Sequence, residues 1–76
     1  MSRQLPALRP AKVLRALERA GFYVHHSKGG HHILRHAERP QLRVTLPMHN
    51  ADLKRKTLTS IIDQAGYSVE EFLRLL

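Results

Sequence analysis

Two adjacent glycines near the middle of this 76-residue chain separate two short segments in which apolar and polar residues alternate. Phe22 and Val24 mark apolar positions of the first segment, and the second reads HHILRH over residues 31–36. Both central residues of a two-residue hairpin turn need a positive φ, which glycine adopts without strain. Gly29 and Gly30 therefore predict an antiparallel hairpin with the glycines at its tip.

A helix is predicted before the hairpin, and a third strand after it. Pro10 suits the first turn of a helix, and Gly21 suits the stop, so the helix covers about residues 10–20. A turn at residues 37–40 leads to an alternating segment that Pro47 closes. The apolar positions are Val13, Leu14, Leu17 and Ala20 in the helix, and Leu42, Val44 and Leu46 in the strand.

The last third of the chain predicts two further helices. Apolar residues recur there at positions i, i+3, i+4 and i+7, which is typical of an amphipathic helix, and Gly66 ends it. The residues 68–71, SVEE, form a capping-box pattern that opens a short final helix. The apolar positions of the first of these helices are Leu58, Ile61, Ile62 and Ala65.

These elements predict an α+β fold with the order α-β-β-β-α and a short C-terminal helix. A three-stranded antiparallel sheet with both longer helices on one face would bury their apolar sides. We expect residues 1–76 to form a single domain, because no linker, repeat or low-complexity segment interrupts them. The absence of cysteine excludes disulfides and thiolate metal sites. No segment has the length of a membrane span or the pattern of a signal peptide, so we expect a cytoplasmic protein.

The pairing of the hairpin decides which side chains share a face. A two-residue turn places Lys28 opposite His31, and the pairing then continues along both strands. The helix-packed side is expected to carry Phe22, Val24 and Ile33, with Lys28 and His31 at its rim. The open side is expected to carry Tyr23, His25, His32, Leu34 and His36. A shift of one residue would exchange the two faces, and in either register a ligand reaches both His31 and His32.

The chain is strongly basic, with a formal net charge of +7. Residues 1–36 hold seven lysines and arginines against one glutamate, whereas residues 37–76 hold six basic and five acidic residues. A polyanion is the expected partner of the first half, because phosphate backbones attract such patches without reading sequence. A basic surface that serves solubility, or one that binds an acidic protein, would have the same composition.

Three interpretations of the six histidines compete. A zinc site is disfavoured, because His32 and His36 lie four positions apart on a strand, which spans roughly 13 Å. Zinc–ligand bonds are only about 2 Å long, so His49 or His25, from elsewhere in the chain, would have to complete the site. The simplest interpretation is solvated histidines on a polar face, and we apply it to His25, His26 and His36. The third interpretation is acid–base chemistry on RNA.

RNA can be cleaved without a water nucleophile, because its 2′-hydroxyl can attack the adjacent phosphate. Imidazole suits the proton transfers, since its unperturbed pKa of about 6.5 lies near the working pH. Lysine and arginine stabilise the charge that develops on phosphorus. A histidine directly after the Lys-Gly-Gly turn, with Lys28 and Arg35 nearby, supplies both kinds of group, so His31 and His32 are the candidate catalytic residues. Lys28, Gly29, Gly30 and Arg35 are expected around the scissile phosphate, and Lys12, Arg15, Arg19, Lys54, Arg55 and Lys56 along the flanking RNA.

Three segments, KGGHHILRH, RVTLPMH and DLKRKTLTSIIDQAGYSVEEF, resemble the HicA (YcfA-like) family of toxin ribonucleases. In that family a lysine, a glycine, a small residue and a histidine open the second strand. A V-T-V-P-x-H segment and a K-G-T-L-x-x-I-L-x-x-A-G-L helix follow in the same order. The resemblance covers about residues 10–72, and its third-strand segment matches Val44, Thr45, Pro47 and His49.

The resemblance implies a fold like that of the double-stranded-RNA-binding domain. It also implies the toxin of a type II toxin–antitoxin system: an mRNA interferase that needs no metal or other cofactor and inhibits translation and growth. The essential histidine of the family matches His31, although some members place it one position later, at His32. The implied partners are single-stranded mRNA and a HicB-type antitoxin that covers the basic active-site face.

The chain departs from the family pattern at three positions that affect substrate contacts. Gly30 replaces the commoner serine and removes a hydroxyl. Lys56 stands where glycine is usual, at the start of the second long helix, and this change either alters that turn or adds a phosphate contact. Leu34 replaces a common aromatic residue and so removes a possible platform for base stacking.

Two other functions fit part of the sequence. A non-catalytic RNA-binding module of the same fold would need the basic surface but no chemistry. The segment TSIIDQAGYSVEEFLRLL has the spacing of a DNA-binding helix-turn-helix, with Gly66 in the turn. Its recognition helix would begin with Glu70 and Glu71, which phosphates repel, and this disfavours DNA binding.

Overall fold

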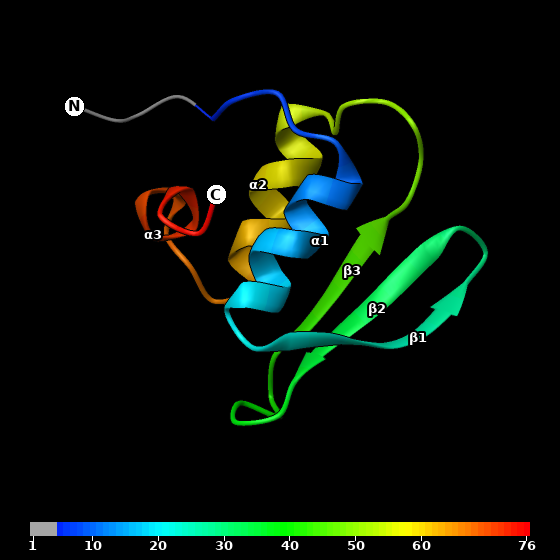
Figure 1. Cartoon of the computed structure of the whole chain (residues 1–76), viewed down its shortest axis with the longest axis vertical. Coiled ribbons are helices and arrows are strands. Elements are labelled where there is room, and N and C mark those ends of the chain that lie inside the picture. The colour runs from blue at the N-terminus through cyan, green and yellow to red at the C-terminus, as the bar shows by residue number, and fades with distance from the viewer. Residues whose placement is uncertain (1–4) are drawn as a thin grey trace.

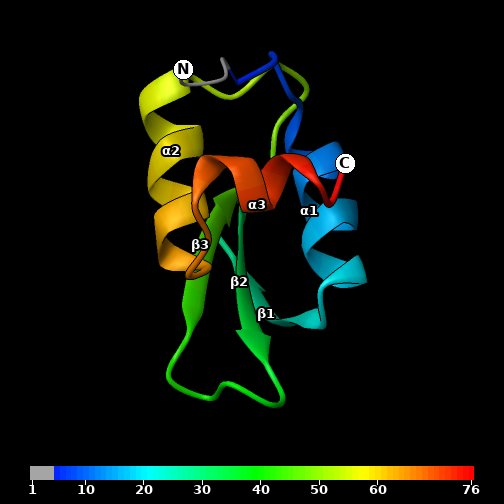
Figure 2. The ribbon, with the colours of Figure 1, turned by 90° about the vertical axis from the view of Figure 1, so that its left-hand side faces the viewer.

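The computed structural model describes residues 5–76 of the chain. Its elements are α1 (Pro10–Arg19), β1 (Phe22–Lys28), β2 (His31–His36), β3 (Arg43–Pro47), α2 (Arg55–Gln64) and α3 (Val69–Leu73). The strands form one antiparallel sheet in the order β1-β2-β3. Both long helices lie on the same face of this sheet, and α3 crosses between them (Figures 1 and 2). The predicted α+β fold and its order of elements are confirmed.

The first helix begins and ends where the sequence predicts. Pro10 occupies the first turn, where its missing N–H is not needed, and Ala20 caps the C-terminal end before Gly21 turns the chain toward β1. Val13, Ala16 and Leu17 are buried. In the part of the chain that the structure describes, no helix is both long and apolar enough to cross a membrane.

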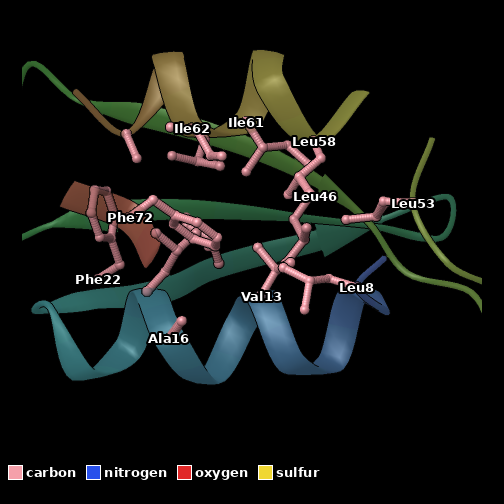
Figure 3. Packing of buried hydrophobic residues seen from close by; sticks show 14 residues of the cluster. Leu8, Val13, Ala16, Phe22, Leu46, Leu53, Leu58, Ile61, Ile62 and Phe72 are labelled. Carbon is pink, nitrogen blue, oxygen red and sulfur yellow. The ribbon is translucent and has the colours of Figure 1, made fainter. Parts of the chain in front are cut away.

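A hydrophobic core fills the space between the helices and the sheet (Figure 3). Leu8 and Leu53, which precede α1 and α2, close one end of it, and the backbone N–H of Leu53 donates to the Leu8 carbonyl at 2.7 Å. Phe72 of α3 is fully buried among the same residues. The buried members are Leu8, Val13, Ala16, Leu17, Phe22, Leu34, Val44, Leu46, Leu53, Leu58, Ile61, Ile62, Ala65 and Phe72.

The hairpin contains a bulge that was not predicted from the sequence. Near the turn the register is as expected, with Lys28 opposite His31. The pairing then shifts between Val24 and His26, so that Leu34 faces Val24 instead of His25. β1 has one extra residue at this point. As a result, the residues of β1 before and after the bulge follow opposite patterns of alternation between the two faces of the sheet.

The bulge overturns the predicted assignment of side chains to faces. Leu34 and His36, which we expected on the open side, are buried on the helix-packed side, opposite Val24 and Phe22. Ile33 was expected in the helix-packed core, yet it lies outside the core cluster, because its neighbour Leu34 occupies that side. The prediction was wrong because it continued a regular ladder through the position where β1 gains a residue.

For the same reason, the two candidate catalytic histidines lie on the sides of the sheet opposite to those predicted. His32 pairs with Ser27 and with the buried Leu46, and it is half-buried toward the helices. His31 pairs with Pro47 and is exposed on the opposite side. We predicted the reverse placement, with His31 on the helix side and His32 outward.

The capping box at α3 is confirmed in full. The Glu71 N–H donates to the Ser68 hydroxyl at 3.1 Å, and the Ser68 N–H donates to the Glu71 carboxylate at 2.8 Å. The hydrogen bonds from Ser68 lower the pKa of the Glu71 carboxyl below its ordinary value. The ionised carboxylate therefore favours the folded state.

Replacing Ser68 by alanine is expected to lower the free energy of unfolding by about 1 kcal/mol, because α3 loses its cap. Because the pKa of the Glu71 carboxyl is lowered in the folded state, this group contributes stability at pH values above its pKa in the unfolded chain. The contribution is lost as the pH falls through the pKa that Glu71 has in the folded protein. Urea unfolding of the wild type and Ser68→Ala at neutral pH measures the first effect. Unfolding of Glu71→Gln beside the wild type at neutral and acidic pH measures the second, because the backbone N–H of residue 68 still donates to Glu71 in Ser68→Ala. Equal sensitivity of the wild type and Glu71→Gln to acid would contradict the assignment.

Candidate functional site

Several chain segments that are distant in sequence converge at the turn end of the hairpin. Because β2 and β3 are antiparallel, β2 begins where β3 ends, and His31 lies opposite Pro47. The Met48 N–H donates to the Gly30 carbonyl at 2.8 Å and fixes the exit of β3 against the turn. The loop after β3 then leads directly to the first turn of α2 (Figure 1).

The glycine turn has the backbone that the sequence predicts. Gly29 and Gly30 have φ values of +57° and +80°. Two successive positive φ values are what a two-residue hairpin turn of type I′ requires. The turn therefore holds the first residue of β2, His31, at the rim of the sheet.

One nitrogen of the His31 ring is engaged, which determines the role of the other. Nδ1 lies 3.2 Å from the Gly29 carbonyl oxygen. A carbonyl can only accept a hydrogen bond, so Nδ1 carries the proton of the neutral ring. The lone pair of Nε2 is then free, and the side chain is exposed. This arrangement suits a proton acceptor.

His31 lines an open hollow at the free edge of β3, next to α2. Within it, Gln64 accepts a hydrogen bond from the Thr45 N–H at 2.8 Å, and its amide donates to the Ser60 hydroxyl at 3.2 Å. The remaining lining residues are Pro47, Lys56, Thr57 and Ile61. Ser60 and Gln64 were not predicted from the sequence, although with Lys56 they lie at i, i+4 and i+8, a spacing that places them on one side of a helix.

His32 occupies a different environment from its neighbour. Its Nδ1 is 2.8 Å from the hydroxyl of Ser27, across the hairpin. Successive residues of a strand point to opposite faces, so the His31 and His32 rings face away from each other. Of the two candidate catalytic histidines, only His31 lines the hollow beside α2.

The predicted cationic residues are spread over the molecule. Lys28 is exposed directly opposite His31 in the register, and Lys56 lines the hollow. Arg35 lies four positions along β2, roughly 13 Å away, and its guanidinium donates to the Pro40 carbonyl at 2.9 Å. Lys54 is the residue that precedes α2.

The cations of α1 are divided between two roles. Lys12 and Arg15 are exposed on the outer side of the helix, away from its buried stripe. Arg19 was expected to follow the RNA as well, but its guanidinium donates twice to the Leu75 carbonyl, at 3.0 and 2.5 Å. Arg19 therefore fastens the C-terminal end of the chain to α1.

The three histidines interpreted as solvated differ from one another. His25 and His26 are exposed, and the bulge brings their Nδ1 atoms within 2.8 Å. His36 is not solvated: its side chain is buried, Nε2–H donates to the Ala20 carbonyl at 2.8 Å, and Nδ1 accepts from the Glu38 N–H at 3.2 Å. Among residues 5–76, no three histidine or acidic side chains are grouped so as to hold a metal ion.

A second hollow adjoins the first and contains His49. The two hollows share Pro47 and Thr57, and the second is also lined by Asp52 and Lys54. The Nδ1 of His49 accepts a hydrogen bond from the Ala51 N–H at 3.2 Å. In the sequence, His49 was named as part of the third-strand motif and as a residue that could complete a zinc site, but not as a catalytic candidate.

A comparison with protein families identifies the chain. The family model described as "HicA toxin of bacterial toxin-antitoxin" matches residues 10–67 of the chain. The chain belongs to this HicA toxin family. The matched segment includes the glycine turn and both hollows, and membership places the protein as the toxin of a toxin–antitoxin system. No curated protein matched the HicA chain.

Proposed function

We propose that this HicA protein is an endoribonuclease that cleaves single-stranded mRNA in the cytoplasm without a metal ion and so inhibits translation and growth. The observation that carries the proposal is the exposed His31 ring, held by the Gly29 carbonyl with its Nε2 free. Membership of a toxin family supports the same conclusion.

His31 acts as the general base in this mechanism. Its Nε2 takes the proton of the 2′-hydroxyl, the 2′-oxygen forms a bond to phosphorus, and the bond from phosphorus to the 5′-oxygen breaks. The 5′-oxygen takes a proton from water or from the protonated imidazole. The products are a 2′,3′-cyclic phosphate and a 5′-hydroxyl, and positioned acid–base groups of this kind contribute about 10²–10⁴-fold.

The cations near His31 stabilise the extra charge on the phosphate. Lys28 is directly opposite His31, and Lys56 lines the hollow that His31 borders. Gly29 and Gly30 let the RNA approach the backbone, since neither turn residue carries a side chain. Lys12, Arg15, Lys54 and Arg35 contact the RNA backbone on either side.

The proposed protein partner is a HicB-type antitoxin. A toxin of this class needs a partner that blocks it, and the basic residues at the turn end are best matched by acidic side chains. Contact with Lys28, Lys56 and the His31 ring would exclude RNA from the site.

A second candidate function is a non-catalytic RNA-binding module with a fold like that of the double-stranded-RNA-binding domain. The observed order of elements, α1-β1-β2-β3-α2, and the exposed cations of α1 and of the α2 N-terminus favour it. Such modules contact phosphates and 2′-hydroxyls by shape. This function requires nothing of His31.

Incubation of the purified protein with a long single-stranded RNA in EDTA distinguishes the two functions. We expect cleavage in EDTA, with 2′,3′-cyclic phosphate and 5′-hydroxyl ends that end-specific labelling detects. A 2′-O-methyl RNA of the same sequence should bind but stay intact, because it has no 2′-hydroxyl to attack. Binding of both RNAs without cleavage of either would instead assign the RNA-binding module.

A further inference from the structure

We propose that His49 is a second catalytic residue: in its neutral form it donates a hydrogen bond from Nε2 to an oxygen of the scissile phosphate. This inference rests on the ribonuclease function proposed above and adds to it the group that stabilises the phosphate. It is carried by the hollow that His49 lines, which adjoins the hollow of His31, and by the contact that the Nδ1 of His49 makes.

His31 and His49 both lie close to Pro47, His31 across the sheet and His49 two residues along the chain. Pro47 lies directly opposite His31, and it lines both hollows. Opposed residues in an antiparallel sheet have Cα atoms about 5 Å apart, and two residues of chain reach at most about 7 Å. The Cα atoms of His31 and His49 are therefore within about 12 Å, and two imidazole side chains can flank one phosphate group across this distance.

The hydrogen bonds at Nδ1 of the two rings leave Nε2 as an acceptor in His31 and as a donor in His49. The partner of His31 is a carbonyl, which leaves Nε2 as an acceptor. The partner of His49 is the N–H of Ala51, which can only donate. The Nδ1 of His49 is therefore unprotonated, and its neutral ring carries the proton on Nε2. One ring is set to remove a proton, and the other to donate a hydrogen bond.

A neutral donor suits the stabilisation of a phosphate. It can bond to a non-bridging oxygen as charge develops there, and it need not lose its proton in any step. The charged residues that line the hollow with His49 are Asp52 and Lys54, and Lys56 lines the adjoining hollow. Two cations against one carboxylate favour an anionic ligand between the hollows.

His32 does not offer the same function. Its ring lies on the same side of the sheet as the buried Leu46, and its Nδ1 is engaged with the Ser27 hydroxyl, 2.8 Å away. It lines neither of the hollows that border Pro47. The paired histidines at the turn therefore supply one catalytic ring, and the partner ring comes from the loop after β3.

The test compares two substitutions that each keep one half of the imidazole. Asparagine in His49→Asn can accept the Ala51 N–H as Nδ1 does, but it has no donor at the position of Nε2. Glutamine in His49→Gln places an amide N–H near that position. Single-turnover cleavage in EDTA should fall about 10²–10³-fold in His49→Asn, the usual loss for one such donor. His49→Gln should retain at least about tenfold more activity than His49→Asn.

Three cleavage outcomes are informative. Equal, wild-type rates in both variants would overturn the role of His49 while leaving the ribonuclease function intact. Equal losses in both, with a matching loss of thermal stability, would also overturn it and make His49 a structural residue of the loop. Loss in His49→Asn with partial recovery in His49→Gln, at unchanged melting temperature, would support it.

A binding measurement tests the contact even if the wild type cleaves no RNA. With ¹⁵N-labelled histidine, titration with 2′-O-methyl RNA should shift the Nε2 resonance of His49, which His49→Asn identifies by its absence. A shift in a protein that does not cleave would refute the ribonuclease and leave the phosphate contact standing. No shift of this resonance on saturation with RNA would refute the contact itself.

Discussion

Replacing His31 by alanine is expected to reduce the rate of RNA cleavage by at least about 10²–10⁴-fold, because the ring that removes the 2′-hydroxyl proton is lost. Binding of uncleavable 2′-O-methyl RNA should change little, since the exposed cations around the site remain. The side chain is exposed at the rim of the sheet, so the fold should not depend on it. Single-turnover cleavage in EDTA, with binding measured separately, checks both expectations.

His32→Ala is the matched control, one residue along the same strand. Its ring faces the other side of the sheet and contacts Ser27. We therefore expect His32→Ala to cleave RNA at a rate within about tenfold of the wild type, well short of the loss that removal of a general base causes. The reverse result, with His32→Ala inactive and His31→Ala active, would move the catalytic role to the other ring.

The Gly21→Ala variant is expected to be the most destabilising of the glycine substitutions, by about 3 kcal/mol. Gly21 has a φ of +102°, and an added Cβ would lie 2.6 Å from Nε2 of His36. A left-handed backbone costs an L-residue roughly 1–2 kcal/mol. The His36 ring would also have to leave the Ala20 carbonyl, and a buried hydrogen bond left unmade costs roughly 1–3 kcal/mol.

Gly66→Ala is the control for the backbone effect. Gly66 also follows the C-cap of a helix and has a positive φ of +81°, but a Cβ there would meet only the flexible end of Leu42, at 3.4 Å. Its cost should be about 1–2 kcal/mol. Thermal unfolding separates the two variants, because each kcal/mol corresponds to roughly 4–8 °C in a domain of this size.

The double variant Gly21→Ala/His36→Ala shows whether the ring is the cause. Removing the His36 side chain takes away the atoms that a Cβ at position 21 would contact. The two substitutions should therefore cost less together than the sum of their separate effects, by about 1 kcal/mol or more. Additive costs would show that only the backbone of Gly21 resists substitution.

Local sequence was sufficient to predict the elements of this fold. The glycine pair predicted the turn, and Pro10 and the SVEE box marked the starts of α1 and α3. Each of these signals acts through the backbone of a few neighbouring residues, so it can be read without knowing the rest of the structure. The same local signal placed His31 directly after the turn, at an accessible rim.

The faces of the strands could not be predicted in the same way. Alternation predicts which residues share a side only while the ladder is regular, and β1 gains one residue between Val24 and His26. The core requires Leu34 and Phe22 on the helix side, and the turn requires Lys28 opposite His31. Only a bulge satisfies both requirements, because each residue inserted in a strand exchanges the two sides.

The sequence by itself determined the order of elements, the glycine turn, the basic charge and the presence of a histidine beside that turn. Tertiary structure decided that His31 rather than His32 lines the hollow beside α2. It also decided that the hollow of His49 adjoins the hollow of His31 at Pro47. The physical reason is that these relations depend on strand pairing and on helix packing, which join residues far apart in the chain. No local pattern of side chains contains that information.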